Sequence, residues 1–207
     1  MKNLEGLLEF MTSVGKLKRI PRTGWLEAGV KEPESIADHI FRTSILALLL
    51  ADLQGVDSEK VVRMALIHDL AEAQTGDLTP EQKQKKGVEH LIEEEEAMER
   101  LLSNLPKKIA EIWGSLWEDY RSGRSPEARI VLQADRLEMI LQALEYEEEG
   151  MDPSKLDRFL LVEEEEGLPS ELLRELEKKR DRIESKLSAH GHVSYSLRDG
   201  QVRRANL

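Results

Sequence analysis

The adjacent residues His68 and Asp69 are the side chains of this sequence best suited to chemistry. They lie in the run from Val61 to Glu72, whose other members are mostly apolar and suit a buried helix face. A buried imidazole beside a carboxylate needs a partner, because an unpaired buried charge is costly. A divalent cation is the natural candidate for that partner.

Acidic side chains close to this pair could join it. On a continuous helix, Glu72 lies four residues after His68 and three after Asp69, so the three side chains can lean toward one patch. Asp77 follows just beyond the expected helix end at Gly76. We therefore expect a cluster of acidic groups beside the imidazole.

Two further polar residues, His39 and Asp135, interrupt apolar helical faces far away in the sequence. Taken singly, His39 has a plainer interpretation as a packed histidine, and Asp135 as half of a surface ion pair with Arg136. Together with His68 and Asp69 they form a pattern typical of a metal site. That interpretation requires three separate helices to converge.

Composition limits which metals and partners fit. The chain contains no cysteine, so imidazole and carboxylate are the available ligands, which favours Mn, Co, Fe, Ni or Mg over structural zinc. Its 41 acidic and 30 basic residues give a formal net charge of −11, which predicts no general attraction to nucleic acid or to an anionic membrane. Any phosphate ligand must therefore be held by local basic residues or by the metal.

The longest apolar stretch, from Ile45 to Ala51, is far shorter than a bilayer-spanning helix. The first residues do not show a basic segment followed by an apolar one. We expect a soluble, cytoplasmic protein with no membrane partner.

The elements that must position these residues are all predicted to be helices. An apolar face over residues 4–14 predicts the first helix, and Ser35 with Asp38 forms a capping box that begins the next. The helix carrying His68 is expected over residues 58–75. Further helical faces are expected within 91–102, 109–120, 130–144, 151–162 and 170–187. The sequence therefore predicts an all-α fold.

Residues 16–30 break the helical pattern. This segment contains Pro21, Gly24 and Gly29, which favour a loop. The loop is expected to carry Arg19, Arg22 and Trp25.

The length and the pattern predict one domain over residues 1–190. The remaining residues, 191–207, alternate polar and apolar side chains around an Asp-Gly turn signal. They are expected to form a small hairpin or a tail.

The order of His39, the pair His68-Asp69 and the distant Asp135 resembles the motif of the HD-domain superfamily of metal-dependent phosphohydrolases. Within it, the chain looks like the YfbR-type 5′-deoxynucleotidases, and most like the HD-domain-containing branch shared by archaea and eukaryotes. The likeness runs through residues 4–187. The stretches that carry it are 17–25, 33–39, 65–72, 75–78, 94–98, 133–143 and 145–147.

This resemblance implies a compact HD-domain helical bundle that forms a homodimer. Carried over by position, it implies a metal on His39, His68, Asp69 and Asp135. It further implies that Glu72, Asp77 and the backbone carbonyl of Leu78 hold a second ion or act on water.

The same family likeness implies hydrolysis of deoxyribonucleoside 5′-monophosphates. A phosphomonoester dianion repels nucleophiles, and a divalent metal both neutralises its charge and makes hydroxide available at neutral pH. Our hypothesis gives Glu72 the role of base or water-orienting group and places Asp77 near the leaving 5′ oxygen.

The substrate would be held by the segment before the second helix. Arg22, or alternatively Arg19, would clamp the phosphate, because a guanidinium matches two phosphoryl oxygens. Trp25 would pack on the sugar and exclude a 2′ hydroxyl, or else anchor the loop in the core. In YfbR the matching Arg and Trp are adjacent, whereas Thr23 and Gly24 separate them here.

Two other functions remain open. The chain could be an HD phosphohydrolase that acts on a nucleoside triphosphate, a cyclic dinucleotide or guanosine tetraphosphate. It could also be a nonenzymatic helical module that keeps a structural metal and binds a partner. The presence of Glu72 and Asp77 beside the four ligand candidates favours catalysis.

Overall fold

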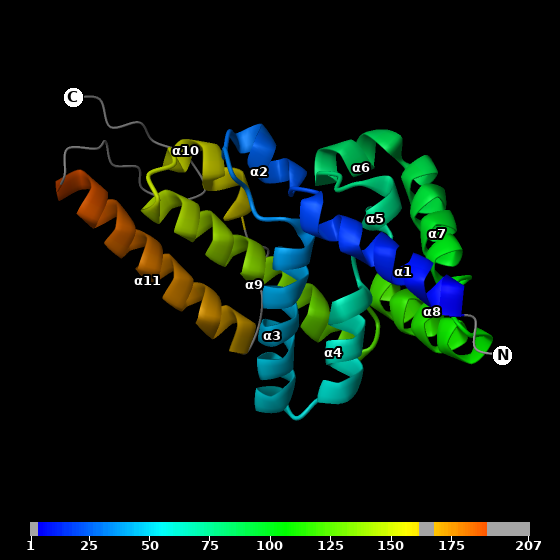
Figure 1. Cartoon of the computed structure of the whole chain (residues 1–207). Helices are drawn as coiled ribbons and strands as arrows, with labels where there is room; N and C mark the ends of the chain where they lie inside the picture. Colours follow the sequence, from blue (N-terminus) through cyan, green and yellow to red (C-terminus); the bar gives the residue numbers. More distant parts are fainter. Residues whose placement is uncertain (1–3, 162–167, 190–207) are drawn as a thin grey trace. The chain divides into compact units, whose positions relative to one another are not determined.

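The computed structural model describes residues 4–161 and 168–189, and these fold as helices joined by short turns (Figure 1). Within these ranges the β pairing is limited to an isolated bridge between Pro21 and Ser35. The all-α prediction is confirmed. The predicted hairpin or tail at 191–207 lies outside the described residues. Among the described helices, none combines the length and apolar character needed to cross a membrane.

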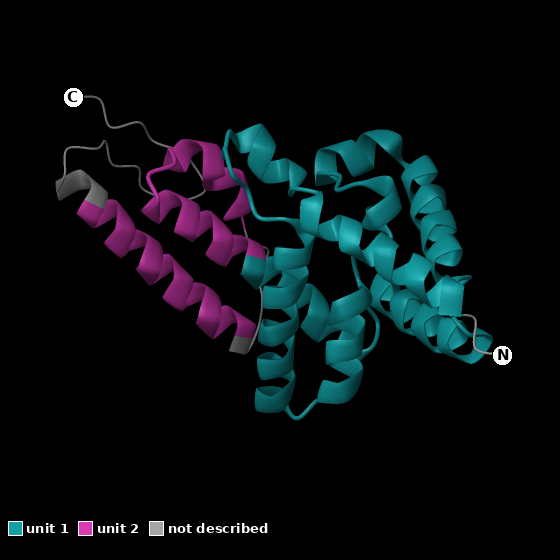
Figure 2. Ribbon diagram, viewed as in Figure 1, with its two compact units in different colours: residues 1–138 teal, residues 139–207 magenta. Residues whose placement is uncertain are grey.

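The chain divides into two compact units, residues 1–138 and 139–207 (Figure 2). Helix α9 (Pro126–Glu148) contributes to both units. The single domain expected over 1–190 stays a prediction. The other elements of the first unit are α1 (Leu4–Lys16), η1 (Leu17–Arg19), α2 (Thr23–Ala28), α3 (Ile36–Gln54), α4 (Ser58–Ile67), α5 (Glu72–Thr75), α6 (Pro80–Lys86), α7 (Val88–Leu102) and α8 (Lys107–Ser122).

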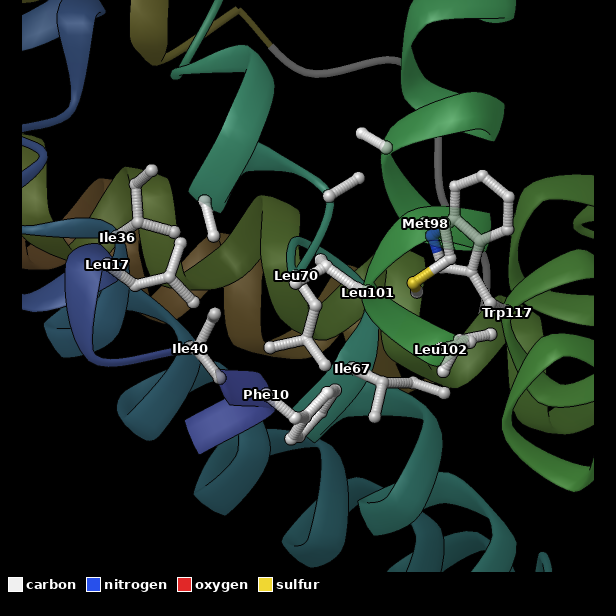
Figure 3. Packing of buried hydrophobic residues seen from close by; sticks show 13 residues of the cluster. Phe10, Leu17, Ile36, Ile40, Ile67, Leu70, Met98, Leu101, Leu102 and Trp117 are labelled. Atoms are coloured by element: carbon white, nitrogen blue, oxygen red, sulfur yellow. The ribbon is translucent and has the colours of Figure 1, made fainter. Parts of the chain in front are cut away.

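The apolar core of the first unit gathers side chains from most of these helices (Figure 3). Phe10 of α1 packs edge-on against Trp113 of α8, with ring centroids 5.6 Å apart. Leu101 of α7 and Ile36 of α3 are fully buried in the same cluster. Because this core joins segments far apart in sequence, it fixes the positions of the turns between them.

Helix α3 begins as predicted. The Ser35 side chain accepts a hydrogen bond from the Asp38 backbone N–H, and the Asp38 carboxylate accepts one from the Ser35 backbone N–H. This capping box sets the register of the helix. As a result His39 lies on the buried face of α3, with its side chain inaccessible to solvent.

The prediction of one continuous helix over 58–75 is wrong at His68. Helix α4 ends at Ile67, residues 68–71 form a turn, and α5 begins at Glu72. The indole N–H of Trp117 donates to the His68 carbonyl (3.2 Å), which the Glu72 N–H would use in an α-helix. Glu72 N–H bonds to the carbonyl of Asp69 instead. The core tryptophan therefore anchors the turn at the His-Asp pair to α8.

The loop predicted for residues 16–30 is partly wrong, because it contains η1 and α2. Trp25 lies inside α2, Arg22 lies immediately before it, and Arg19 ends η1. Gly29 ends α2 with φ of 91°, a left-handed conformation that suits glycine.

Helix α6 has clear start signals that the sequence prediction did not use. Thr79 and Gln82 form a reciprocal capping box, and Pro80 occupies the first turn. The helix places the Lys83 ammonium 3.7 Å from the Glu72 carboxylate of α5.

The second unit contains the end of α9, α10 (Pro153–Leu156), η2 (Asp157–Phe159) and α11 (Leu168–Ala189). Its apolar cluster is built around Ile140, Leu144 and Ile183. The buried Arg180 pairs with Glu147 (2.7 Å) and with Asp157 (2.6 Å). The helices expected in 151–162 and 170–187 are confirmed, although the side chain of Leu187 lies outside the described residues.

Candidate metal and active site

Four candidate ligands from three separate segments meet in the first unit. His39 comes from α3, His68 and Asp69 from the turn after α4, and Asp135 from α9. His39, His68 and Asp135 offer ligand atoms that all lie within 4.8 Å of one another. The Asp69 carboxylate lies 3.1 Å from Nε2 of His68 and 3.7 Å from Nε2 of His39. The predicted convergence is therefore present.

Both imidazoles are held through their Nδ1 atoms. Nδ1 of His39 lies 2.6 Å from the Glu138 carboxylate, and Nδ1 of His68 lies 2.7 Å from the Ala65 carbonyl. Since a carboxylate and a carbonyl can only accept here, each Nδ1 carries a hydrogen, and each ring in its neutral form has a lone pair on Nε2. Both Nε2 atoms are buried and make no hydrogen bond of normal geometry.

The buried Nε2 atoms of His39 and His68 face two aspartates, and this arrangement fits a divalent cation. Imidazole and carboxylate are suitable ligands for such an ion, and the ion would bind the Nε2 lone pairs of the neutral rings. Asp135 Oδ1 lies 3.1 Å from Nε2 of His39, which completes the group. The imidazole side chains are fully buried, whereas the Asp135 side chain is 32% exposed, so solvent reaches the site from its carboxylate side.

Electrostatics keep both aspartates ionised. Burial acts to raise the pKa of Asp69, but the neighbouring His68 and Arg22 hold that pKa well below its usual range. Burial also acts to raise the pKa of Asp135, but the contact with His39 outweighs it and lowers that pKa. Burial and Arg22 lower the pKa of His39, yet its contacts with Asp135 and Glu138 outweigh them and raise it to about 10. A proton and a metal ion thus compete for Nε2 of His39.

Glu72, the first residue of α5, lies beside this group and is almost completely buried. Its Oε1 atom lies 3.7 Å from the ammonium of Lys83, while Oε2 is buried without a hydrogen bond. Burial, reinforced by the charges of Asp69 and Asp77, raises the pKa of Glu72 well above its usual value. A carboxylate with a raised pKa is better suited to take up a proton than an exposed carboxylate with the usual pKa.

Asp77 is hydrogen-bonded to residues at the start of α2. Its carboxylate accepts a hydrogen bond from the Arg22 guanidinium (2.9 Å) and another from the Thr23 backbone N–H. The Thr23 hydroxyl donates to the Asp77 backbone carbonyl (2.9 Å). Arg22 also lies 3.5 Å from Asp69. These contacts bring the segment before α2 and the segment after α5 to the edge of the group formed by the four candidate ligands.

A comparison with protein-family models matches residues 14–175 to the HD domain. The chain belongs to the HD-domain family. It is 41% identical over 161 residues to the 5′-deoxynucleotidase HDDC2 of Danio rerio, a match that covers 78% of this chain and 80% of the relative.

Solved structures agree with membership of the HD-domain family. A conserved hypothetical protein from Pyrococcus furiosus superposes with a TM-score of 0.62 at 37% identity, covering 84% of this chain and 99% of the other. A predicted metal-dependent phosphohydrolase from Magnetospirillum magnetotacticum gives a TM-score of 0.64 at 25% identity, covering 93% and 96%.

The remaining candidates of this HD-domain chain lie in different surroundings. Trp25 is 2% exposed and its indole donates to Glu34 (2.9 Å), which favours the anchoring role. Arg19 is exposed at the end of η1, and Leu78 follows Asp77 in the turn before α6. The contact of Trp25 with a sugar, the phosphate contact of Arg19 and the ligand role of the Leu78 carbonyl stay predictions.

Sequence reasoning missed Glu138 and Tyr120 beside the HD motif. Glu138 is fully buried and bonds to His39, and the Tyr120 ring packs edge-on against His68 at 5.4 Å. Glu138 carries a sequence signal, since it lies one helical turn after Asp135 on an apolar face. Tyr120 carries none, because aromatic residues on inner helix faces are common in cores.

Proposed function

We propose that this HD-domain chain is a metal-dependent 5′-deoxynucleotidase that hydrolyses deoxyribonucleoside 5′-monophosphates to deoxynucleosides and phosphate. The observation that carries the proposal is the pair of buried, unpartnered Nε2 atoms of His39 and His68 facing Asp69 and Asp135. Support for the substrate comes from the similarity to relatives named 5′-deoxynucleotidase in animals and fungi.

The four residues would hold one divalent ion, with Mn, Co, Mg, Ni and Fe as the candidates. When bound, such a cation neutralises charge on a phosphoryl group and lowers the pKa of water. The two neutral imidazoles add no charge, so the two carboxylates together would balance the formal charge of the divalent ion.

The surrounding side chains would bind and orient the substrate. Arg22 lies at the solvent-accessible edge, where its guanidinium can take two phosphoryl oxygens while Asp77 keeps it in place. Glu72 would take the proton of the attacking water, because its side chain is buried beside the candidate metal ligands and its pKa is raised. Asp77 would lie near the leaving 5′ oxygen, with its position set by Thr23.

A phosphate-release panel tests the proposed function. The protein is stripped with a chelator, restored separately with each of the five metals, and offered ribo- and deoxynucleoside monophosphates, triphosphates, cyclic dinucleotides and guanosine tetraphosphate. We expect metal-dependent turnover of deoxynucleoside 5′-monophosphates above all others. Turnover confined to another nucleotide class, or no turnover with any metal, would overturn the proposal.

We also propose that the chain forms a homodimer through α3. This helix exposes Phe41, Ile45, Leu49 and Leu53 at four-residue spacing, each more than half exposed. Residues spaced in this way form one stripe along a helix. In a chain of net charge −11, pairing this uncharged stripe with its own copy would avoid repulsion between like charges.

Light scattering coupled to gel filtration checks this interface. The wild-type chain is expected at the mass of two chains, and the double variant Ile45→Lys with Leu49→Lys at the mass of one. Ile112→Lys, which alters an exposed apolar residue of α8, serves as the control and should leave the dimer intact. A monomeric wild type would exclude the homodimer.

Two further expectations belong to this proposal. The acidic charge supports a nucleotide substrate held at a local site without general binding to nucleic acid. A cytoplasmic location is proposed for the same enzyme.

A further inference from the structure

Glu138 is a carboxylate placed where burial is costly. It lies one turn after Asp135 on α9, and its side chain is fully inaccessible to solvent. An ionised group removed from water destabilises the fold unless it is paired and hydrogen-bonded. Its partners therefore indicate what the residue does.

Both oxygens of this carboxylate are used by residues of α3. Oε2 accepts from Nδ1 of His39 (2.6 Å), while Oε1 accepts from Nε (2.9 Å) and Nη2 (2.8 Å) of Arg42. His39 and Arg42 are three residues apart and so lie on neighbouring positions of one helix face. Arg42 reaches toward the surface, with its side chain 31% exposed.

We infer that Glu138 is a positioning residue for the metal site, which with Arg42 holds His39 with Nδ1 protonated and Nε2 directed at the ion. The guanidinium pairs with the carboxylate, and the carboxylate fixes both the ring orientation and the tautomer of His39. This inference rests on the proposed metal site and is independent of which nucleotide is cleaved.

The two imidazoles are supported unequally. His39 is held by a charged acceptor, whereas Nδ1 of His68 donates to the neutral carbonyl of Ala65. A charged acceptor makes the opposite nitrogen a stronger donor to a cation. Removing the charge of Glu138 should therefore weaken one ligand and leave the His68 ligand unchanged.

A second cation between Glu34, His39 and Glu138 does not explain the buried carboxylate. Ligand atoms of these three residues also lie within 4.8 Å of one another. However, Nδ1 of His39 is committed as a hydrogen-bond donor to Glu138 at 2.6 Å and has no lone pair for an ion. The buried carboxylate of Glu138 is therefore assigned to supporting the proposed ion site on the Nε2 side of His39.

The test compares the Mn²⁺ affinities of the wild-type chain and its variants. Each is prepared as full-length, metal-free protein and titrated with Mn²⁺ alone in a calorimeter. In Glu138→Gln the side chain keeps its size and loses its charge, and we expect binding about 10 to 100-fold weaker than in the wild type. Glu127→Gln is the matched control, because it removes a glutamate of the same helix that pairs with Lys60. Circular dichroism and thermal unfolding without metal show whether each variant is folded.

Arg42 provides a second measurement in which the Glu138 side chain itself is unchanged and only its partner is replaced. Arg42→Met should also weaken Mn²⁺ binding, and Arg42→Lys should restore part of it, since the lysine keeps the charge. Wild-type affinity in Glu138→Gln, or an equal loss in Glu127→Gln, would overturn the inference. If Mn²⁺ binds as expected while no deoxynucleotide is cleaved, the proposed function fails and this inference stands.

Discussion

Asp69→Asn is expected to reduce metal-dependent phosphate release by about 10³-fold or more, because it removes the charge of a proposed metal ligand while preserving the shape of the side chain. Metal ions contribute several kcal/mol to such reactions, and each ~1.4 kcal/mol corresponds to a factor of ten in rate. Asp69 faces both imidazoles, at 3.1 Å from His68 and 3.7 Å from His39. Steady-state phosphate release with saturating metal gives the rate.

The same variant should bind Mn²⁺ much more weakly, which separates the loss of a ligand from damage to the substrate site. Asp119→Asn is a suitable control, since that aspartate pairs with Lys60 outside the ligand group. We expect the control to keep its rate and its metal affinity. Full activity in Asp69→Asn would remove this residue from the site.

The convergence of the site could be predicted because each polar residue lies on an apolar face. His39 and Asp135 each interrupt such a face, and a shared metal is a partner that satisfies both. The capping box at Ser35 also fixed the register that turns His39 inward. Local signals of this kind are readable in a single sequence.

The helix break at His68 could not be predicted, because the contact that accompanies it comes from elsewhere in the chain. Trp117, 49 residues later, takes the His68 carbonyl as acceptor. Nothing between Ser58 and Gly76 marks the position, since the apolar spacing continues through it. The break gives His68 and Asp69 a turn geometry that a regular helix would not provide.

Helix α2 was missed for the same physical reason. The residue before it, Arg22, makes no capping bond with its side chain. The Asp77 carboxylate, 54 residues away, binds the Thr23 backbone N–H at the helix start. A cap supplied by a distant residue leaves no local start signal, so the glycines and proline of this segment favoured a loop.

The position of Glu138 could be read from the sequence, but its role could not. Its place one turn after Asp135 on an apolar face was visible, but its meaning depends on His39 and Arg42, nearly one hundred residues earlier. A buried glutamate in a sequence does not reveal its partner. The structure supplies the partner and thereby the testable role.

Glu72→Gln distinguishes a proton acceptor from a second metal ligand. As the acceptor, Glu72 contributes about 10² to 10⁴-fold to kcat, so the amide variant should lose that factor with little change in KM. The fold should tolerate the change, because burial already penalises the charged form of this side chain. Phosphate-release kinetics give kcat and KM, and calorimetry with Mn²⁺ gives the number of ions bound.

The number of Mn²⁺ ions decides between the two roles. If Glu72 takes the proton of water, Glu72→Gln binds as many ions as the wild type and turns over slowly. If it holds a second ion, the variant binds one ion fewer, and the acceptor role is wrong. Glu96→Gln, an exposed glutamate of α7 that pairs with Arg100, should match the wild type in both measurements. A kcat close to the wild-type value in Glu72→Gln would exclude both roles, since each requires the carboxylate.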